Sequence, residues 1–462
     1  MENRLQAARS ARGWSQAALF HQLVKTAEDA GDHLPGWASI RQLISRWENG
    51  HASPDHYYTK LLCKVYGTSA VALGLASAGA SGDPKFALQI GANLGQTIDT
   101  VTTLWEHDVE RREFLRTSLF VGYGLTGGQG LLQTAGSPTN TSRLSGTVRV
   151  GMSDVEMLQD LAAAYRRSDN RSGGGAVREK LVRTLHHEVA PLLRRGRYDA
   201  ATGKALVTVA AEMTQLAGWM AYDSGMHGLS QKYLTQGIAL AREAGDEALA
   251  GEILAAMAHQ ATYLGQGQDA VQYAQAAAVS GHRSGQQHLV AEAAVLEAQG
   301  LAQLGASADV AATLSRAERE LDKADRLSGP TYLAYLDEAY LSAKFGHVFR
   351  ELGDGTHTVR FAERSLDMVP GFERGRVFNL TLLAQGQARL GDIDQSLTAG
   401  TEALRLSAEM QSTRVHHYLR EVASLLAPHK AHPGVADFCK RVRYLRTPAA
   451  TQVAGHATPA RQ

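Results

Sequence analysis

The chain is poor in cysteine, proline and aromatic residues, and these shortages exclude several classes of protein. Only two cysteines, Cys63 and Cys439, occur in 462 residues, so a disulfide framework is excluded. Both lie in apolar helical patterns of separate regions, which is typical of reduced core residues in a cytosolic protein. Prolines number 11 and aromatic residues make up 6% of the chain, so long helical stretches face few interruptions.

Long apolar runs and excess charge are also absent. No uninterrupted run of about 18 apolar residues exists and no secretory signal is present, so we expect no membrane span and a cytoplasmic location. The net charge is +1, and residues 1–75 hold eight Lys/Arg against six Asp/Glu, a difference of +2. Bulk charge therefore gives no evidence for nucleic-acid binding, which has to rest on the placement of individual residues.

The motifs of common catalytic sites are missing or incomplete. Neither G-x-x-x-x-G-K-[ST] nor H-E-x-x-H occurs, and no Ser/His/Asp or Cys/His set is assignable. Residues 122–127 fit G-x-G-x-x-G, but a parallel-sheet pattern and an acid about 20 residues later are lacking, which favours a linker. The pairs His186-His187 and His416-His417 point about 100° apart on a helix and rarely share one ion. We expect no enzyme activity, metal or cofactor.

Residues 39–50 carry the most informative pattern. Ser39 is placed to cap a helix and Gly50 to end it. Apolar residues recur at helical spacing on one face of this segment, namely Ile40, Leu43, Ile44 and Trp47. The opposite face carries Arg41, Gln42, Ser45 and Arg46. Arg matches guanine and Gln matches adenine with two hydrogen bonds each, so this face is suited to reading a DNA major groove.

The flanking segments complete a small helical domain. Residues 3–12 predict a short basic helix, Ser15 is placed to cap a helix that begins at Gln16, and residues 57–66 form an amphipathic helix. Together, residues 3–70 resemble the Xre/Cro type of helix-turn-helix domain. That resemblance implies base contacts by the exposed face of 39–50 and phosphate contacts by Gln16 and Asn49. Gln16 precedes Glu48 by 32 positions, more than is usual, which predicts an extended first helix and a longer turn.

Composition divides the rest of the chain into segments. Residues 76–91 are rich in Ala, Gly and Ser and indicate a hinge, and residues 122–147 are rich in Gly, Ser and Thr and indicate a linker. Between them we expect a helix over 94–119, and from Ser153 onward helices interrupted at 169–175. The expected organisation is a DNA-binding domain at 1–75, a linking helix and linker at 76–150, a helical domain at 151–446 and a flexible tail at 447–462.

The helical part repeats. Five glycines that each follow an expected helix end are separated by 40, 40, 48 and 38 residues: Gly225, Gly265, Gly305, Gly353 and Gly391. A small residue precedes each glycine by seven positions, and another follows it by twelve. Small residues at fixed points let helices pack closely, so each unit is predicted to be an antiparallel helix pair, and stacked pairs form a solenoid. The pattern resembles tetratricopeptide repeats.

The whole arrangement resembles a family of large regulators from GC-rich bacteria. Two further stretches carry this resemblance, Trp105-x-x-Asp-x-x-Arg-Arg-x-Phe-Leu115 and Leu216-Ala-Gly-Trp-Met-Ala-Tyr-Asp-Ser-Gly225. It implies an all-α transcription factor with an N-terminal helix-turn-helix domain and a C-terminal tetratricopeptide-like solenoid that acts as a sensor. The same architecture occurs in regulators that bind signalling peptides.

The repeat register also predicts a binding groove. The first helix of each pair should line the concave surface, and positions one and four residues after each small residue place polar and aromatic groups there. The expected ligand-binding residues are Trp219, Tyr222, His259, Tyr263, Gln299, His347, Arg350 and Gln385. This column contains no cluster of Lys or Arg, so we expect a mostly apolar small molecule or a short peptide rather than a highly anionic ligand.

The sequence thus favours a sequence-specific transcriptional regulator that binds double-stranded DNA. The expected operator is palindromic, because one recognition helix contacts only a few base pairs and a homodimer doubles the site. Two alternatives stay open, a helical-repeat scaffold for protein partners and a ligand-independent repressor.

Overall fold

A computed structural model describes residues 4–28, 37–49, 56–66, 93–110, 141–143, 145–324 and 329–445, together with a few isolated positions. These residues are predominantly helical, in agreement with the expected all-α class. They form two compact units, Met1–Phe86 and Ala87–Gln462. None of the described helices is long and apolar enough to cross a membrane. Residues 76–90 of the hinge expected at 76–91, the G-x-G-x-x-G run at 122–127 and the tail at 447–462 lie outside the described residues.

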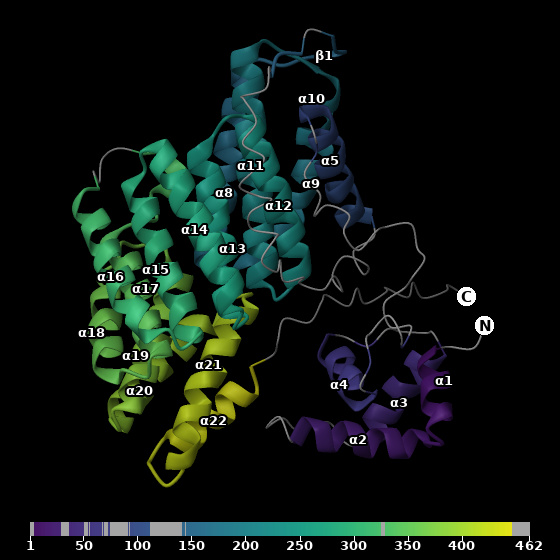
Figure 1. Ribbon diagram of the computed structural model, residues 1–462, viewed down its shortest axis with the longest axis vertical. Helices are drawn as coiled ribbons and strands as arrows, with labels where there is room; N and C mark the ends of the chain where they lie inside the picture. Colours follow the sequence, from purple (N-terminus) through teal and green to yellow (C-terminus); the bar gives the residue numbers. More distant parts are fainter. Residues whose placement is uncertain are drawn as a thin grey trace, which may run out of the picture. The chain divides into compact units, whose positions relative to one another are not determined.

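The described part of the first unit contains four helices, which are labelled in Figure 1. They are α1 (Arg4–Ala11), α2 (Gln16–Glu28), α3 (Trp37–Glu48) and α4 (His56–Tyr66). The expected apolar face of α3 is buried: Ile40 and Ile44 are fully covered and Trp47 is 3% exposed. Helix α3 begins at Trp37, so Ser39 lies inside the helix and does not cap it. At the start of α2, Ser15 accepts a hydrogen bond from the Ala18 amide and caps the helix as expected.

The helix expected at 94–119 is observed as α5 (Leu94–Glu110), and residues 111–119 are not described. It is not a free linking element, because it packs against helices of the second unit. Its apolar face, including Val101, Leu104 and Trp105, is buried. The buried Asp108 carboxylate accepts hydrogen bonds from Arg178 and from the Tyr233 hydroxyl. An ion pair and an apolar face buried together hold α5 in this unit.

The second unit continues with short elements and then long helices. A two-residue parallel strand pair joins β1 (Val148–Arg149) to β2 (Gly196–Arg197). The helices around it are α8 (Met152–Ser172), α9 (Arg178–Thr184), a π-helical turn at Leu185–Val189, and α10 (Ala190–Arg195). Helix α8 runs through Asp169, which is buried, so the interruption expected from residue 169 begins only at Gly173.

Ten helices then follow one another, joined mostly by short connections. They are α11 (Ala200–Asp223), α12 (His227–Glu243), α13 (Glu247–Tyr263), α14 (Gly267–Ser284), α15 (Gln287–Gln303), α16 (Ser307–Asp322), α17 (Glu338–Glu351), α18 (Gly355–Ser365), α19 (Glu373–Arg389) and α20 (Ile393–Leu406). From α11 to α16 and again from α17 to α20 each helix packs on the next, and α17 packs on α15. The alternate helices α11, α13, α15, α17 and α19 contact one another in order. Helices α21 (Thr413–Leu426) and α22 (Val435–Arg443) end the described chain (Figure 1).

The expected helix ends are confirmed. Each of the five repeat glycines follows a helix and has a positive φ, between 69° and 81°. A side chain is strained in that conformation, which explains why glycine recurs there. The small residues seven positions before these glycines lie where two helices pack closely. A Cβ on Gly346, for example, would lie 2.8 Å from Leu382 Cδ2.

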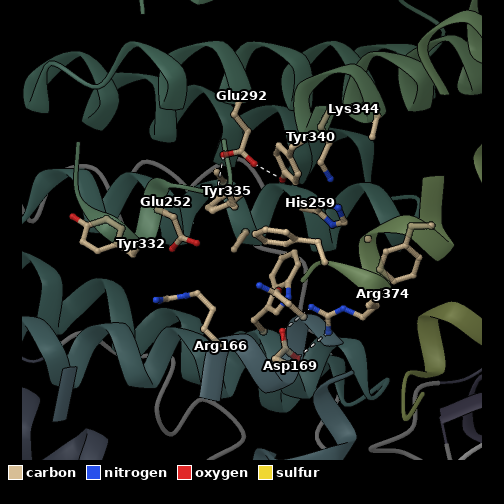
Figure 2. A pocket seen from close by; sticks show the side chains of 18 of the residues that line it. Arg166, Asp169, Glu252, His259, Glu292, Tyr332, Tyr335, Tyr340, Lys344 and Arg374 are labelled. Carbon is tan, nitrogen blue, oxygen red and sulfur yellow. Dashed lines mark hydrogen bonds and ion pairs between the residues drawn. The ribbon is translucent and has the colours of Figure 1, made fainter. Parts of the chain in front are cut away.

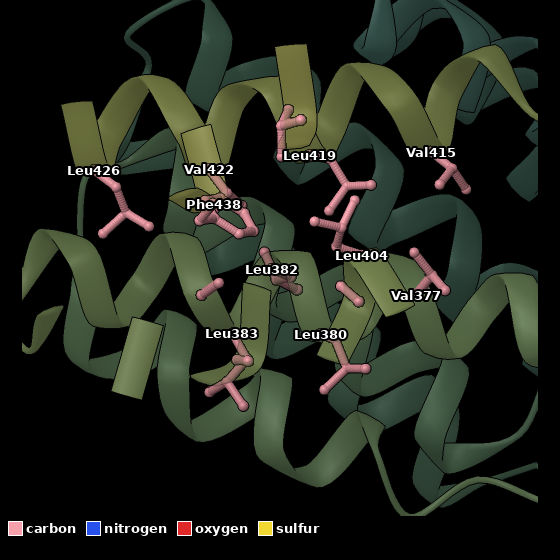
Figure 3. Packing of buried hydrophobic residues seen from close by; sticks show 14 of the residues in the cluster. Val377, Leu380, Leu382, Leu383, Leu404, Val415, Leu419, Val422, Leu426 and Phe438 are labelled. Atoms are coloured by element: carbon pink, nitrogen blue, oxygen red, sulfur yellow. The ribbon is translucent and has the colours of Figure 1, made fainter. Parts of the chain in front are cut away.

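The last helices close the row. Figure 3 shows Val415, Leu419, Val422 and Leu426 along the side of α21 that faces the apolar cluster. Polar contacts then join this end of the unit to its beginning: the Gln411 amide donates to Ser172 O, and the Gly175 amide donates to Gln411 O. The succession of helices therefore curves until α21 meets the α8–α11 region, and it encloses a pocket.

Candidate functional site

The surface of α3 is the candidate nucleic-acid interface. Arg41 and Arg46 are exposed and Ser45 is half-buried. The side chain of Gln42 lies outside the described residues. Asn49 is exposed, and its side-chain amide donates to Ser45 O at 2.8 Å, just past the last turn of α3. Two expected base-reading side chains are therefore available to a partner, and Asn49 extends the end of the same helix.

Glu48 holds α3 against the two preceding helices. Its carboxylate is buried, and it accepts two hydrogen bonds from the Arg9 guanidinium, at 2.5 and 3.0 Å. Its bond with Arg9 raises the pKa of that guanidinium. Glu48 also accepts one hydrogen bond from the Gln16 side chain at 2.8 Å. Gln16, expected to contact phosphate, is therefore engaged by Glu48 in this structure. Its side chain fixes the placement of α3, a role the sequence analysis did not assign to it.

A pocket of about 250 Å³ is enclosed in the second unit (Figure 2). Side chains from α8, α11, α13, α15, α17, α19 and α21 line it, together with the segment at 331–335. In Figure 2, Glu252 and Arg166 lie toward one end, and His259 and Arg374 lie toward the other. Much of the wall is aromatic, contributed by Trp219, Tyr332, Tyr335, Tyr340, Phe372, Phe378 and Tyr418.

One end of the pocket is acidic and rich in tyrosine. Glu292 accepts hydrogen bonds from the Tyr340 hydroxyl at 2.5 Å and the Tyr335 hydroxyl at 3.1 Å. Glu252 accepts one hydrogen bond, from the Gln215 amide at 2.9 Å, and its other oxygen, Oε2, has no protein partner. Burial raises the pKa of Glu252 to about 8, and the neighbouring Glu292 adds to the shift. This shift favours the protonated form of Glu252 at neutral pH.

Lysine and arginine side chains occupy the other end and the walls. Lys344 is buried over the Tyr340 ring, and burial lowers its pKa to about 7. Arg374 forms two hydrogen bonds to the buried Asp169, at 2.8 and 2.6 Å, and contacts Asp223 at 3.0 Å. Asp169 and Arg374 are 205 residues apart in the chain, so this ion pair fastens the beginning of the helical row to its end.

Arg414 lies among aromatic rings in the same region. Its guanidinium carbon is 4.3 Å from the Tyr222 ring centroid, 4.6 Å from Phe378 and 5.4 Å from Trp219. Its Nη1 is 3.7 Å from Asp223. Neither Nη1 nor Nε makes a hydrogen bond to the described part of the chain, although the residue is 3% exposed. A buried guanidinium with unused donors is suited to a ligand oxygen.

The expected ligand-binding residues do not all meet at the pocket. Trp219, His259 and His347 line it, and burial lowers the pKa of both histidines, which favours neutral rings. Tyr222 lies behind the wall and its hydroxyl is 3.0 Å from His259 Nδ1. Tyr263 packs at the edge of the Tyr222 ring.

The remaining three of these residues lie away from the lining. Arg350 contacts Glu351 at 2.6 Å and Glu421 at 3.8 Å. The Gln385 side-chain amide donates a hydrogen bond to Glu421. The third residue, Gln299, is buried. The structure has a pocket in the region of the expected groove, and side chains of α21 form part of its wall. Basic groups reach the pocket from outside the expected column, since four basic side chains line it: Arg166, Lys344, Arg374 and Arg414.

A second register in the repeats carries the pocket residues that the sequence analysis missed. Positions thirteen residues before each repeat glycine are Glu212, Glu252, Glu292, Tyr340 and Phe378. Each of these positions precedes one residue of the expected ligand-binding column by seven residues. Seven residues are about two helical turns, so the two positions lie on the same face of their helix. Four of the five line the pocket, and Glu212 pairs with the lining residue Arg166 at 2.8 Å. Arg374 and Arg414, by contrast, have no equivalent in the repeat pattern.

Within the described ranges, no group of three or more His, Cys, Asp or Glu side chains is arranged to hold a metal ion. Comparison with known proteins adds no name to this geometry: no protein-family model, no curated protein and no solved structure matches the chain.

Proposed function

We propose that the protein is a cytoplasmic transcriptional regulator whose first unit binds double-stranded DNA and whose second unit binds a small signal molecule. In this proposal the first unit is a helix-turn-helix domain of the Xre/Cro type, and the second is a tetratricopeptide-like solenoid closed by its last helices. Arg41, Gln42, Ser45 and Arg46 read bases, and Asn49 contacts the backbone.

The observation that carries the DNA-binding proposal is the two-sided character of α3. Its apolar side is buried inside the first unit, whereas Arg41 and Arg46 are exposed. These two arginines are separated along α3 by more than one helical turn. The buried Glu48 then fixes α3 to α1 and α2 through Arg9 and Gln16. A helix held rigidly by its neighbours, with free guanidinium groups on its outer face, is what base recognition in a major groove requires.

The enclosed pocket supports the sensor part of the proposal. A pocket of about 250 Å³ with an aromatic wall and unpartnered polar atoms suits a small ligand. The pocket wall includes both the beginning and the end of the helical row. A bound molecule would therefore contact both ends of the row and could change how they pack together. A ligand shifts DNA affinity only as far as it prefers one arrangement of the chain over another.

The test measures binding of the full chain to genomic DNA fragments by mobility shift. We expect Arg41→Ala and Arg46→Ala to relax sequence preference, with a loss of about 1–3 kcal/mol on the best fragment. Lys25→Ala is the matched control, because Lys25 is an exposed cation on α2 away from the α3 surface. Equal binding by all four proteins would refute the recognition-helix assignment, and no binding by any of them would favour a protein-interaction scaffold.

A further inference from the structure

Two buried polar groups in the pocket have hydrogen-bonding atoms that the protein does not use. Glu252 Oε2 lacks a partner at one end, and Arg414 Nε and Nη1 lack hydrogen bonds at the other. Glu252 is 7% exposed and Arg414 is 3% exposed, so bulk water does not replace the missing partners. Leaving such groups unpaired is unfavourable, and both line the pocket. An occupant that supplies a donor to Glu252 and an acceptor to Arg414 removes both deficits.

The helices set the spacing of these two groups. Glu252 and His259 lie seven residues apart on α13, which corresponds to about 10 Å along the helix axis. Arg414 belongs to the His259 end, because it stacks on the Tyr222 ring whose hydroxyl contacts His259. The two unpartnered groups are therefore separated by roughly 10 Å along the pocket. Trp219, which packs against both Arg414 and His259, provides part of the aromatic wall between them.

The charges around the pocket leave one carboxylate in excess. Five acids lie in or directly behind the wall, namely Asp169, Glu212, Asp223, Glu252 and Glu292. Four bases face them, namely Arg166, Lys344, Arg374 and Arg414. Each base apart from Lys344 is within 4 Å of an acid, and none of these contacts involves Glu252. In the empty pocket a proton supplies the missing positive charge on Glu252. A ligand cation can take its place.

The surroundings of Glu252 suit an ammonium group. In Glu292, a neighbouring carboxylate, each oxygen already accepts a hydrogen bond from a tyrosine hydroxyl, Tyr335 or Tyr340. Tyr332 and Tyr335 line the same end of the pocket, and the faces of such rings attract cations. Glu252 is thus the acceptor left for a charged donor, within an aromatic enclosure.

We propose that the pocket binds an amphoteric small molecule with an ammonium group at Glu252, a carboxylate or carbonyl oxygen at Arg414, and an aromatic body between them. The ammonium donates to Oε2 of Glu252, and the ligand oxygen accepts from Nε and Nη1 of Arg414. The proposal deepens the sensor function above, on which its role as a signal rests. The binding chemistry itself depends on the pocket alone.

Binding of an ammonium should release a proton. The charged groups that face Glu252 are Glu212 on α11, Glu292 on α15 and Arg166 on α8, with Tyr332 nearby. The two acids favour the protonated form of Glu252 and Arg166 opposes them, and the outcome is a protonated carboxyl at neutral pH. A cationic ligand ionises this carboxyl and expels its proton to solvent. A ligand hydroxyl in the same place would leave the proton where it is.

The experiment uses three matched probes and the full-length protein in isothermal titration calorimetry. The first probe is a single benzene ring that carries an aminomethyl group and a carboxylate para to each other. The second has methyl in place of aminomethyl, and the third has methyl in place of carboxylate. We expect the first probe to bind about tenfold or more tightly than either of the others. Titrations at pH 7 in two buffers of different ionisation enthalpy should show about one proton released per bound first probe.

Glu252→Gln separates the ammonium contact from general fit. The amide keeps the size of the side chain and can still pair with Gln215, and circular dichroism checks the fold. In this variant the advantage of the aminomethyl group and the proton release should both disappear, whereas Glu402→Gln, an exposed change on α20, should retain them. Equal affinity for the first two probes, binding without proton release, or no binding of any probe would each overturn the proposal. These measurements contain no DNA, so their failure is distinct from failure of the proposed regulator function.

Discussion

At the scale of single residues, the buried Glu48 is the centre of the first unit. Its carboxylate satisfies both Arg9 and Gln16, so removing it leaves a part-buried guanidinium and an amide without their partner. We expect Glu48→Ala to lower the free energy of unfolding of the first unit by roughly 2–4 kcal/mol, measured by thermal or urea unfolding. Arg46→Ala, an exposed change on the same helix, should stay within about 0.5 kcal/mol of the wild type. Equal stability of the two variants would contradict the role assigned to Glu48.

Glu252 gives the second unit a pH dependence with a definite sign. Its pKa is about 8 in the folded protein against an ordinary value of 4.5, so between these values the folded chain holds a proton that the unfolded chain has lost. The wild type should therefore lose stability as pH rises from about 5 to 8, by on the order of a few kcal/mol relative to Glu252→Gln, and the difference should level off above pH 8.

Lys344 acts in the opposite direction, because its pKa falls from 10.5 to about 7. Lys344 therefore adds stability as pH rises from about 7 to 10.5. This effect is the same in the wild type and in Glu252→Gln, so it cancels in the difference between their free energies of unfolding. Urea unfolding at a series of pH values measures the difference between wild type and Glu252→Gln, and a flat difference across pH 5–8 would contradict the burial of this carboxyl.

At the scale of helices, backbone contact between α14 and α15 depends on glycine. A Cβ at Gly300 would lie 2.9 Å from Gly267 O and 3.0 Å from Val271 Cγ2. Because a backbone oxygen cannot yield as a flexible side chain does, Gly300→Ala should destabilise the second unit by about 1–3 kcal/mol. Gly375→Ala is the control, since its new methyl group meets chiefly the flexible end of Met368. Thermal unfolding of both variants measures this, and an unaffected Gly300→Ala protein would show that the two helices can separate at little cost.

The sequence predicted the helices well because their signals are local. The glycine at each repeat end, the small residues at fixed offsets and the buried face of α3 all follow from periodicity and backbone conformation. The closure of the helical row could not be predicted in this way, because it depends on the pairing of Asp169 with Arg374 across 205 residues. The same closure explains why only Trp219, His259 and His347 of the expected ligand column reach the pocket.

At the scale of the whole molecule, we expect a homodimer. One α3 surface contacts few base pairs, whereas two copies related by a two-fold axis read two half-sites about one helical turn of DNA, or a multiple of it, apart. Sedimentation at micromolar concentration should therefore give a dimer, at least in the presence of bound DNA. A monomer with and without DNA would contradict this arrangement.

Selection of sequences by the full chain from a pool of random double-stranded DNA tests whether α3 reads DNA bases. We expect enrichment of a palindromic site with half-sites about 10 base pairs, or a multiple of that, apart. In Arg41→Ala or Arg46→Ala we expect loss of preference at individual positions. If the wild type selects no sequence from the pool, or if both variants select the same site as the wild type, base reading by α3 is contradicted.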